Sequence, residues 1–204
     1  MGGRKLGGVS VAAVTVAAAI LGFLPASTLA GPVMIWSEGF ENGFPPEASV
    51  TGSWSVINSP TSAHSGSSGA DIDGPTGTNG DVLFLPLSSV GYQDLGWEYW
   101  LKVRDGLETG DQVLAQWTVD GANWETLATY TNQVAGDWQL ATFDLPISAD
   151  NNSNLAFRFF ANLANSSDRM NFDDITLSGT PVPEPATLGL LALGALTVAR
   201  RRSR

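Results

Sequence analysis

The stretch "DQVLAQWTVDGANWETLATYT", residues 111–131, alternates apolar and polar side chains on either side of a turn. Val113, Ala115 and Trp117 share one face of an extended chain, because side chains alternate along a β-strand. The segment DGAN at 120–123 contains residues typical of tight turns. The stretch therefore predicts a β-hairpin with one apolar face.

Similar segments recur before and after this hairpin, rich in Val, Thr, Trp, Tyr and Phe and separated by Gly, Asn, Asp and Pro. No window of the body shows a helical stripe with caps. This pattern predicts an all-β fold, a two-sheet antiparallel sandwich of the jelly-roll type; an immunoglobulin-like sandwich is the alternative. The predicted strands are 33–38, 52–57, 68–73, 81–86, 95–103, 111–119, 124–131, 137–144, 154–161 and 170–178.

The chain has 204 residues and no cysteine, which excludes disulfides and thiolate metal sites. Its formal net charge is −10, and residues 31–180 alone carry 19 acidic and 4 basic side chains, a net charge of −15. A surface of this sign argues against nucleic acid as a partner and favours divalent cations and neutral or cationic ligands. One histidine without cysteine cannot supply the usual zinc ligands.

The first thirty residues have the layout of a secretory signal peptide. Arg4 and Lys5 precede an apolar run over 9–24, and small residues stand at Thr28 and Ala30. We expect a signal-peptide helix in residues 1–30 and cleavage after Ala30. The alternative is an uncleaved anchor, although a run of about 16 residues is short for a membrane span.

Residues 181–204 form a separate C-terminal segment. Positions 186–199 carry no charge, and as a helix they would span roughly 21 Å, less than the roughly 30 Å hydrocarbon core of a bilayer. An arginine cluster follows and is expected to stay on the cytoplasmic side as a membrane stop. Its members are Arg200, Arg201, Arg202 and Arg204. The segment predicts a short transmembrane helix that anchors the chain only weakly in the membrane.

Val182, Pro183, Glu184 and Pro185 stand just before this apolar segment. Together with the short helix and the arginines, they resemble the PEP-CTERM sorting signal of Gram-negative bacteria. The resemblance implies recognition by an exosortase, a membrane cysteine transpeptidase, and removal of the tail. It also implies an inner-membrane intermediate and delivery to the cell surface or extracellular matrix. The alternative is a permanent single-span anchor.

The body between the two end segments, 31–180, has four short landmarks: FENG at 40–43, AHSG at 63–66, TVDGANWETL at 118–127 and FDDITL at 172–177. They resemble landmarks of bacterial jelly-roll modules, which include carbohydrate-binding modules and MAM-like and laminin-G-like surface domains. The resemblance implies that the first and last strands lie side by side. It further implies a structural calcium held by an early Glu and a late Asp.

The calcium ligands that this resemblance implies are Glu41, Asp173 and Asp174. At most one of the two aspartates can point inward, because neighbouring strand residues face opposite sides. Oxygen ligands are the ones that calcium prefers. Further candidates by residue type are Glu38, Asp71 and Asp73; the alternative is that all six carboxylates are solvated.

All seven tryptophans follow Gly31. An indole can stack on a sugar ring, but it also buries a large apolar area, so most are expected in the core. Trp100 and Trp124 are the predicted ligand platforms for a polysaccharide.

No catalytic residue is predicted. His64 is interpreted as an ordinary loop histidine, and no G-x-S-x-G motif is present. We therefore expect a non-catalytic adhesion or glycan-binding protein. The first alternative is a glycosidase whose acid and base are Glu98 and Glu125, each beside a tryptophan. The second is a purely structural matrix protein.

Overall fold

The computed structural model describes residues 31–77, 80–182 and 189. The predicted signal peptide, 1–30, lies outside the described residues. So do the sorting-motif residues Pro183, Glu184 and Pro185, most of the predicted terminal helix and the arginine cluster. Within the described ranges, no helix combines the length and the apolar character that crossing a membrane requires.

The described residues form eleven strands and one 3₁₀ helix. They are β1 (Val33–Glu38), β2 (Ser49–Val50), β3 (Trp54–Asn58), β4 (Ser68–Asp73), β5 (Asp81–Pro86), β6 (Tyr92–Asp105), β7 (Gln112–Thr118), β8 (Glu125–Tyr130), β9 (Gln139–Asp144), η1 (Ile147–Ala149), β10 (Ala156–Asn162) and β11 (Arg169–Pro181). Each of the ten predicted strands overlaps one of these. The short β2 was not predicted, because two residues carry no readable alternation.

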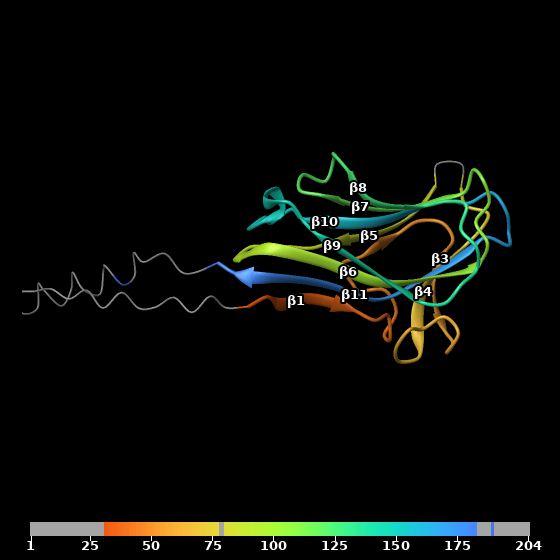
Figure 1. Ribbon diagram of the computed structural model, residues 1–204, viewed down its shortest axis with the longest axis horizontal. Helices are drawn as coiled ribbons and strands as arrows, with labels where there is room; N and C mark the ends of the chain where they lie inside the picture. Colours follow the sequence, from red (N-terminus) through yellow and green to blue (C-terminus); the bar gives the residue numbers. More distant parts are fainter. Residues whose placement is uncertain (1–30, 78–79, 183–188, 190–204) are drawn as a thin grey trace, which may run out of the picture.

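The strands form two antiparallel sheets that face each other as two layers (Figure 1). The six-stranded sheet has the order β3-β4-β11-β6-β9, and β1 also pairs with β11. The five-stranded sheet has the order β2-β5-β10-β7-β8. The predicted all-β jelly-roll sandwich is therefore confirmed.

The first and last strands are neighbours, as the sequence resemblance implied. Residues 33–38 of β1 pair with 175–179 of β11, whereas β4 pairs with the earlier part of β11, 169–172. β1 and β4 thus occupy successive lengths of the same strand edge. The arrangement brings the segment after β1 close to the middle of β11.

Aromatic side chains fill the space between the sheets. Trp97 of β6 stacks on Phe157 of β10 with ring centroids 3.7 Å apart, and Phe159 of β10 lies 4.3 Å from Phe172 of β11. All four rings are buried. In β6 and β10 the buried rings alternate with partly exposed residues, so the side chains between the rings point to the outer faces of the two sheets.

One polar contact crosses this core. The hydroxyl oxygens of Tyr99 in β6 and Tyr130 in β8 lie 2.7 Å apart and share a hydrogen bond. Burial raises the pKa of both phenols, which therefore stay neutral. The contact satisfies two buried polar groups and joins one sheet to the other.

The hairpin predicted from residues 111–131 is β7, a turn and β8. Asp120 organises the turn: its Oδ1 accepts hydrogen bonds from the backbone N–H groups of Ala122 and Asn123. These bonds, led by that from Asn123, lower the pKa of Asp120 from its ordinary value. The turn places Trp124 just before β8.

Candidate functional site

A single row of side chains runs across the outer face of the five-stranded sheet. Directly opposed residues of antiparallel strands share a face. The register pairs Phe84 with Ser49 and Arg158, Arg158 with Gln116, and Gln116 with Thr126. The row therefore takes one residue from each of the strands β2, β5, β10, β7 and β8.

Hydrogen bonds connect the middle of this row. Arg158 Nε donates to Gln116 Oε1 over 2.8 Å, and Gln116 Nε2 donates to Thr126 Oγ1 over 2.9 Å. Gln116 is largely buried, so its amide has one orientation that satisfies both neighbours. The chain holds the Arg158 guanidinium at a set position above the sheet.

Aromatic rings flank the guanidinium. The Cζ atom of Arg158 lies 4.1 Å from the ring centroid of Trp124 and 5.9 Å from that of Phe160, both within cation–π range. Phe84 meets Trp124 edge to face, with centroids 6.0 Å apart. All three rings are partly exposed. The face thus combines apolar ring surface with a fixed hydrogen-bond donor.

Arg158 keeps donors free for a ligand. Among the described residues, no carboxylate forms an ion pair with it, and its terminal nitrogens make no hydrogen bond within the described part of the chain. Burial lowers the pKa of the guanidinium from its ordinary value, but arginine stays protonated in proteins. The row can therefore donate hydrogen bonds to hydroxyl or ring oxygens of a ligand that lies across the strands.

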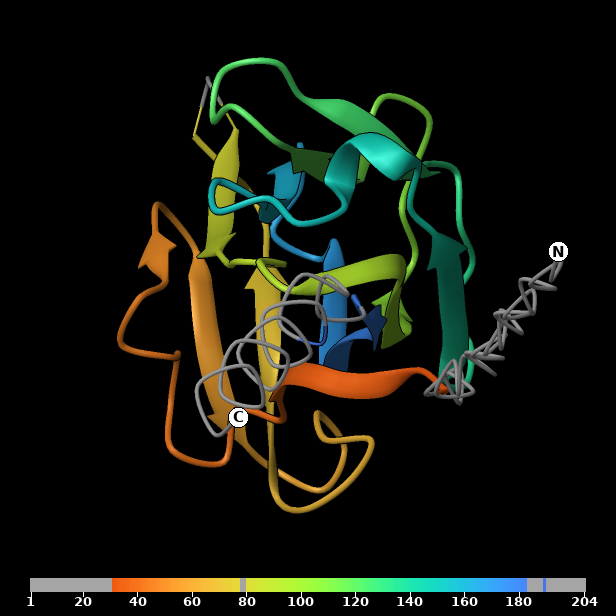
Figure 2. The ribbon, with the colours of Figure 1, turned by 90° about the vertical axis from the view of Figure 1, so that its left-hand side faces the viewer.

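The other predicted platform, Trp100, lies on the outer face of the six-stranded sheet. The His64 ring stacks on it with centroids 3.8 Å apart and an interplanar angle of 12°, and Trp138 meets His64 edge to face. His64 belongs to the connection between β3 and β4, the gold loop at the bottom of Figure 2. One face of Trp100 is therefore covered by the protein itself.

Asp173 and Asp174 hold that connection in place. Asp173 Oδ2 accepts hydrogen bonds from the backbone N–H groups of His64 and Ser65, at 2.7 and 3.1 Å. Asp174 Oδ2 lies 2.7 Å from His64 Nδ1, and Asp174 Oδ1 accepts from Ser65 Oγ. Burial raises the pKa of Asp173 although its backbone hydrogen bonds act in the opposite direction. Asp173 is buried and Asp174 is partly exposed. Both contact the same connection, because the register of β11 shifts between Asp173 and Thr176 and Asp174 has a φ of +46°, so regular alternation is interrupted here.

Glu41 contacts the following residues of the same connection, Ser67 and Ser68. Its carboxylate accepts hydrogen bonds from the backbone N–H groups of Ser67 and Ser68 and from Ser67 Oγ. These bonds lower the pKa of Glu41, with the Ser67 backbone bond the largest cause. Gly66 permits the approach, because a Cβ there would lie 2.2 Å from Glu41 Oε1 and the backbone φ is +62°.

The three predicted calcium ligands thus contact one connection, and their oxygens are hydrogen-bonded to it. These three residues do not form a compact acidic group. Within residues 31–77 and 80–182, one group of three acidic side chains has oxygens within 4.8 Å of one another, and it consists of other residues. Calcium at Glu41, Asp173 and Asp174 stays a prediction. Of the other candidates, Asp71 forms an ion pair with Arg169, and Glu38 accepts a hydrogen bond from the Phe40 backbone.

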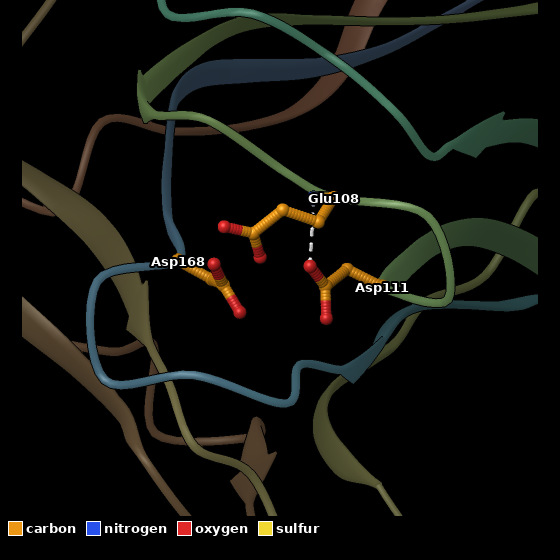
Figure 3. A group of neighbouring side chains, drawn as sticks. All are labelled: Glu108, Asp111 and Asp168. Carbon is orange, nitrogen blue, oxygen red and sulfur yellow. Dashed lines mark hydrogen bonds between the residues drawn. The ribbon is translucent and has the colours of Figure 1, made fainter.

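This compact acidic group consists of Glu108, Asp111 and Asp168, and it could hold a metal ion (Figure 3). Asp111 and Asp168 are buried, whereas Glu108 is exposed. A hydrogen bond from Asn165 lowers the pKa of Glu108, but the contacts with the other two carboxylates outweigh it, so the net shift is upward. The triad joins the β6–β7 connection to the β10–β11 connection.

Residues 181–203 match the PEP-CTERM protein-sorting motif. The chain carries a PEP-CTERM sorting motif. The match confirms the interpretation of Val182 to Pro185 and the segment that follows as a sorting signal. No curated protein matches this chain.

Solved structures with the same fold match the body of this chain. TmCBM61, solved with β-1,4-galactotriose, is 15% identical with a TM-score of 0.52; the match covers 69% of this chain and 93% of that one. The K3 adhesin domain of Lys-gingipain from Porphyromonas gingivalis is 16% identical with a TM-score of 0.51, over 72% and 99% of the two chains. A xylan-binding CBM 22 domain is 16% identical with a TM-score of 0.50, over 74% and 97%. At these identities the similarity shows a shared fold.

The glycosidase alternative named Glu98 and Glu125 as a pair. Glu98 belongs to β6 and accepts a hydrogen bond from Thr176 on the outer face of the six-stranded sheet. Glu125 belongs to β8 of the five-stranded sheet. The two carboxylates therefore lie on different sheets of the sandwich.

Sequence reasoning named Trp124 as a ligand platform, which stays a prediction, but it did not name the side chains that contact Trp124. Arg158 stands between Phe157 and Phe159 in a mostly apolar strand. An isolated charge at an outward position of such a strand indicates a functional residue and could have been noticed in the sequence. The pairing of Gln116 with Arg158 depends on the order of β7 and β10, which one sequence does not reveal. The acidic triad was missed for the same reason.

Proposed function

We propose that this PEP-CTERM protein is exported, processed by an exosortase-type enzyme and delivered to the cell surface or extracellular matrix. The sorting motif at 181–203 supports this route. The predicted signal peptide provides entry, and the short apolar segment provides an inner-membrane intermediate. At its destination the jelly-roll body acts as a non-catalytic binding component.

We further propose that the body binds a polysaccharide on the outer face of the five-stranded sheet. The observation that carries this proposal is the row in which Arg158, fixed by Gln116, lies against the Trp124 ring. Sugar rings present apolar C–H faces and hydroxyl groups together, which matches rings flanking a hydrogen-bond donor. The strongly acidic body favours a neutral polysaccharide, since it repels polyanions.

Isothermal titration of the full-length protein with soluble β-1,4-galactan and with xylan tests this proposal. These probes follow from the ligands named for two proteins of the same fold. Trp124→Ala should weaken binding by about tenfold or more, the cost of about 1.4 kcal/mol that one buried ring contact commonly supplies. The matched control is Trp100→Ala, which should leave the affinity unchanged because its ring lies on the other sheet.

Two results would contradict the binding proposal. One is that no neutral polysaccharide binds; the other is that Trp124→Ala and Trp100→Ala weaken binding equally. Release of reducing ends from a bound polysaccharide would instead support the glycosidase alternative.

The sorting proposal has its own experiment. In the source cells, replacing Pro183, Glu184 and Pro185 by alanine should keep the full-length chain in the inner membrane and remove the processed form from the surface. Fractionation followed by immunoblotting measures both forms. The proposal is wrong if the variant reaches the surface at the wild-type level and size.

A further inference from the structure

Two loops at one end of the five-stranded sheet bring three carboxylates together. Glu108 and Asp111 belong to the connection from β6 to β7, and Asp168 belongs to the connection from β10 to β11. One oxygen of each lies within 4.8 Å of the others, and the carboxylates point toward one another (Figure 3). This group is separate from the row around Arg158.

Backbone donors satisfy part of the group. Asp111 Oδ1 and Oδ2 accept from the N–H groups of Ala164 and Glu108, and Asp168 Oδ2 accepts from the N–H of Asn165. Asp168 Oδ1 differs: the residue is 0% exposed, and this oxygen has no hydrogen-bond partner among the described residues. A fully buried carboxylate oxygen without a partner is costly, so Asp168 Oδ1 is available to a cation or another donor.

No basic side chain supplies that charge. Within residues 31–77 and 80–182, no lysine, arginine or histidine forms an ion pair with the triad. The nearest arginine in sequence, Arg169, is engaged by Asp71, with its Nε 2.9 Å from Asp71 Oδ1. Three carboxylates at this spacing repel one another, and two of them are shielded from water.

We propose that Glu108, Asp111 and Asp168 bind one calcium ion that fastens the two loops to each other. All three side chains offer carboxylate oxygens as ligands. Oxygen ligands suit a hard cation such as calcium, whereas zinc and copper prefer imidazole or thiolate ligands. Calcium accepts irregular sets of carboxylate and carbonyl oxygens from loops, whereas magnesium requires a nearly octahedral set with several waters. The ion can enter beside Glu108, which borders an open hollow lined by residues 106–109 and 132–135.

The position of this ion links it to the five-stranded sheet. Asp111 immediately precedes β7, and the β10–β11 connection that holds Asp168 begins where β10 ends. Gln112 and Asn162 are the last paired residues at that end of the two strands. Calcium would therefore secure the two strands that carry Gln116 and Arg158, but its binding does not depend on any glycan.

Calcium binding by the full-length protein, freed of cations with a chelator, tests the proposal. Titration calorimetry should find a calcium site that depends on Glu108, Asp111 and Asp168. Thermal unfolding should show a midpoint about 5 to 10 °C higher when calcium exceeds its dissociation constant about 100-fold, because the ion binds only the folded state. Asp168→Asn should abolish both effects, and Glu108→Gln, at an exposed position, should weaken them without disturbing the fold.

A comparison in chelator separates metal binding from a purely structural role. Asp168→Asn retains an oxygen for the Asn165 N–H and removes a buried charge, so without calcium it should be as stable as the wild type or more stable. With calcium the order should reverse. Equal destabilisation of Asp168→Asn under both conditions would overturn the proposal.

The matched control is Glu125→Gln, which alters an exposed carboxylate on β8, outside both groups of candidate calcium ligands. It should keep the full calcium response. Loss of the response in Glu41→Gln but not in Asp168→Asn would place the ion with Asp173 and Asp174 and overturn the assignment. No calcium binding up to about 10 mM, roughly tenfold above the weak end of extracellular calcium modules at about 1 mM, would also overturn it. An equal response to magnesium alone would overturn the choice of calcium.

Discussion

Trp124 and Trp100 are both outward-facing tryptophans of the sandwich, but their surroundings differ. Trp124 lies beside a guanidinium with free donors on the five-stranded sheet, whereas Trp100 is covered by the His64 ring on the six-stranded sheet. The cover is fastened by Asp173 and Asp174. The contrast shows that a tryptophan becomes a candidate ligand platform only when no connecting loop packs over it.

The largest expected effect comes from removing the hydrogen bonds between Asp173 and the β3–β4 connection, which covers Trp100. Asp173→Ala leaves the backbone N–H groups of His64 and Ser65 without their acceptor and should lower the free energy of unfolding by about 2 to 3 kcal/mol. Urea unfolding measures this change. Asp173→Asn, which retains one acceptor, should recover part of it, and Asp137→Ala on an exposed loop is the control. A loss below about 0.5 kcal/mol would show that Asp173 does not hold the connection.

Removing the guanidinium tests the opposite face. Arg158→Ala should weaken polysaccharide binding by about tenfold, or about 1.4 kcal/mol, because the ligand loses a fixed donor. Arg104→Ala is the matched control, since Arg104 donates to Ser62 on the six-stranded side. Affinity measured by calorimetry should be unchanged in the control. Equal losses in both variants would indicate a general charge effect rather than a site at Arg158.

Uncovering Trp100 should have a smaller effect. His64→Ala removes a stacked ring pair and should cost about 1 kcal/mol of stability. Quenching of tryptophan fluorescence by acrylamide should increase, and the increase should disappear in the double variant with Trp100→Phe. Unchanged quenching in His64→Ala would mean that another group covers Trp100.

The smallest expected effect is a dependence on pH. Hydrogen bonds from Ser67 and Ser68 lower the pKa of Glu41 below its ordinary value of 4.5. The ionised carboxylate therefore stabilises the fold above about pH 4.5, and this contribution is lost as the pH falls through the lowered pKa. The difference in unfolding midpoint between the wild type and Glu41→Gln should shrink from pH 6 to pH 3. A constant difference would contradict this linkage.

The sequence by itself determined the features that depend on neighbouring residues. Alternation over β7 and β8 and the turn at Asp120 predicted the hairpin, because pleating and turn geometry are local properties. The succession of Pro-Glu-Pro, a short apolar segment and an arginine cluster predicted the sorting motif, which the match at 181–203 confirmed. These patterns can be recognised without knowing which strands are neighbours.

The tertiary structure alone decided which distant residues meet. The register of β10 against β7 places Arg158 beside Gln116, and the path of the β3–β4 connection places His64 over Trp100. Two connections bring Asp168 to Glu108 and Asp111. Such contacts depend on strand order, and strand order is set by how both sheets bury their apolar faces together, a property of the whole chain rather than of any one segment.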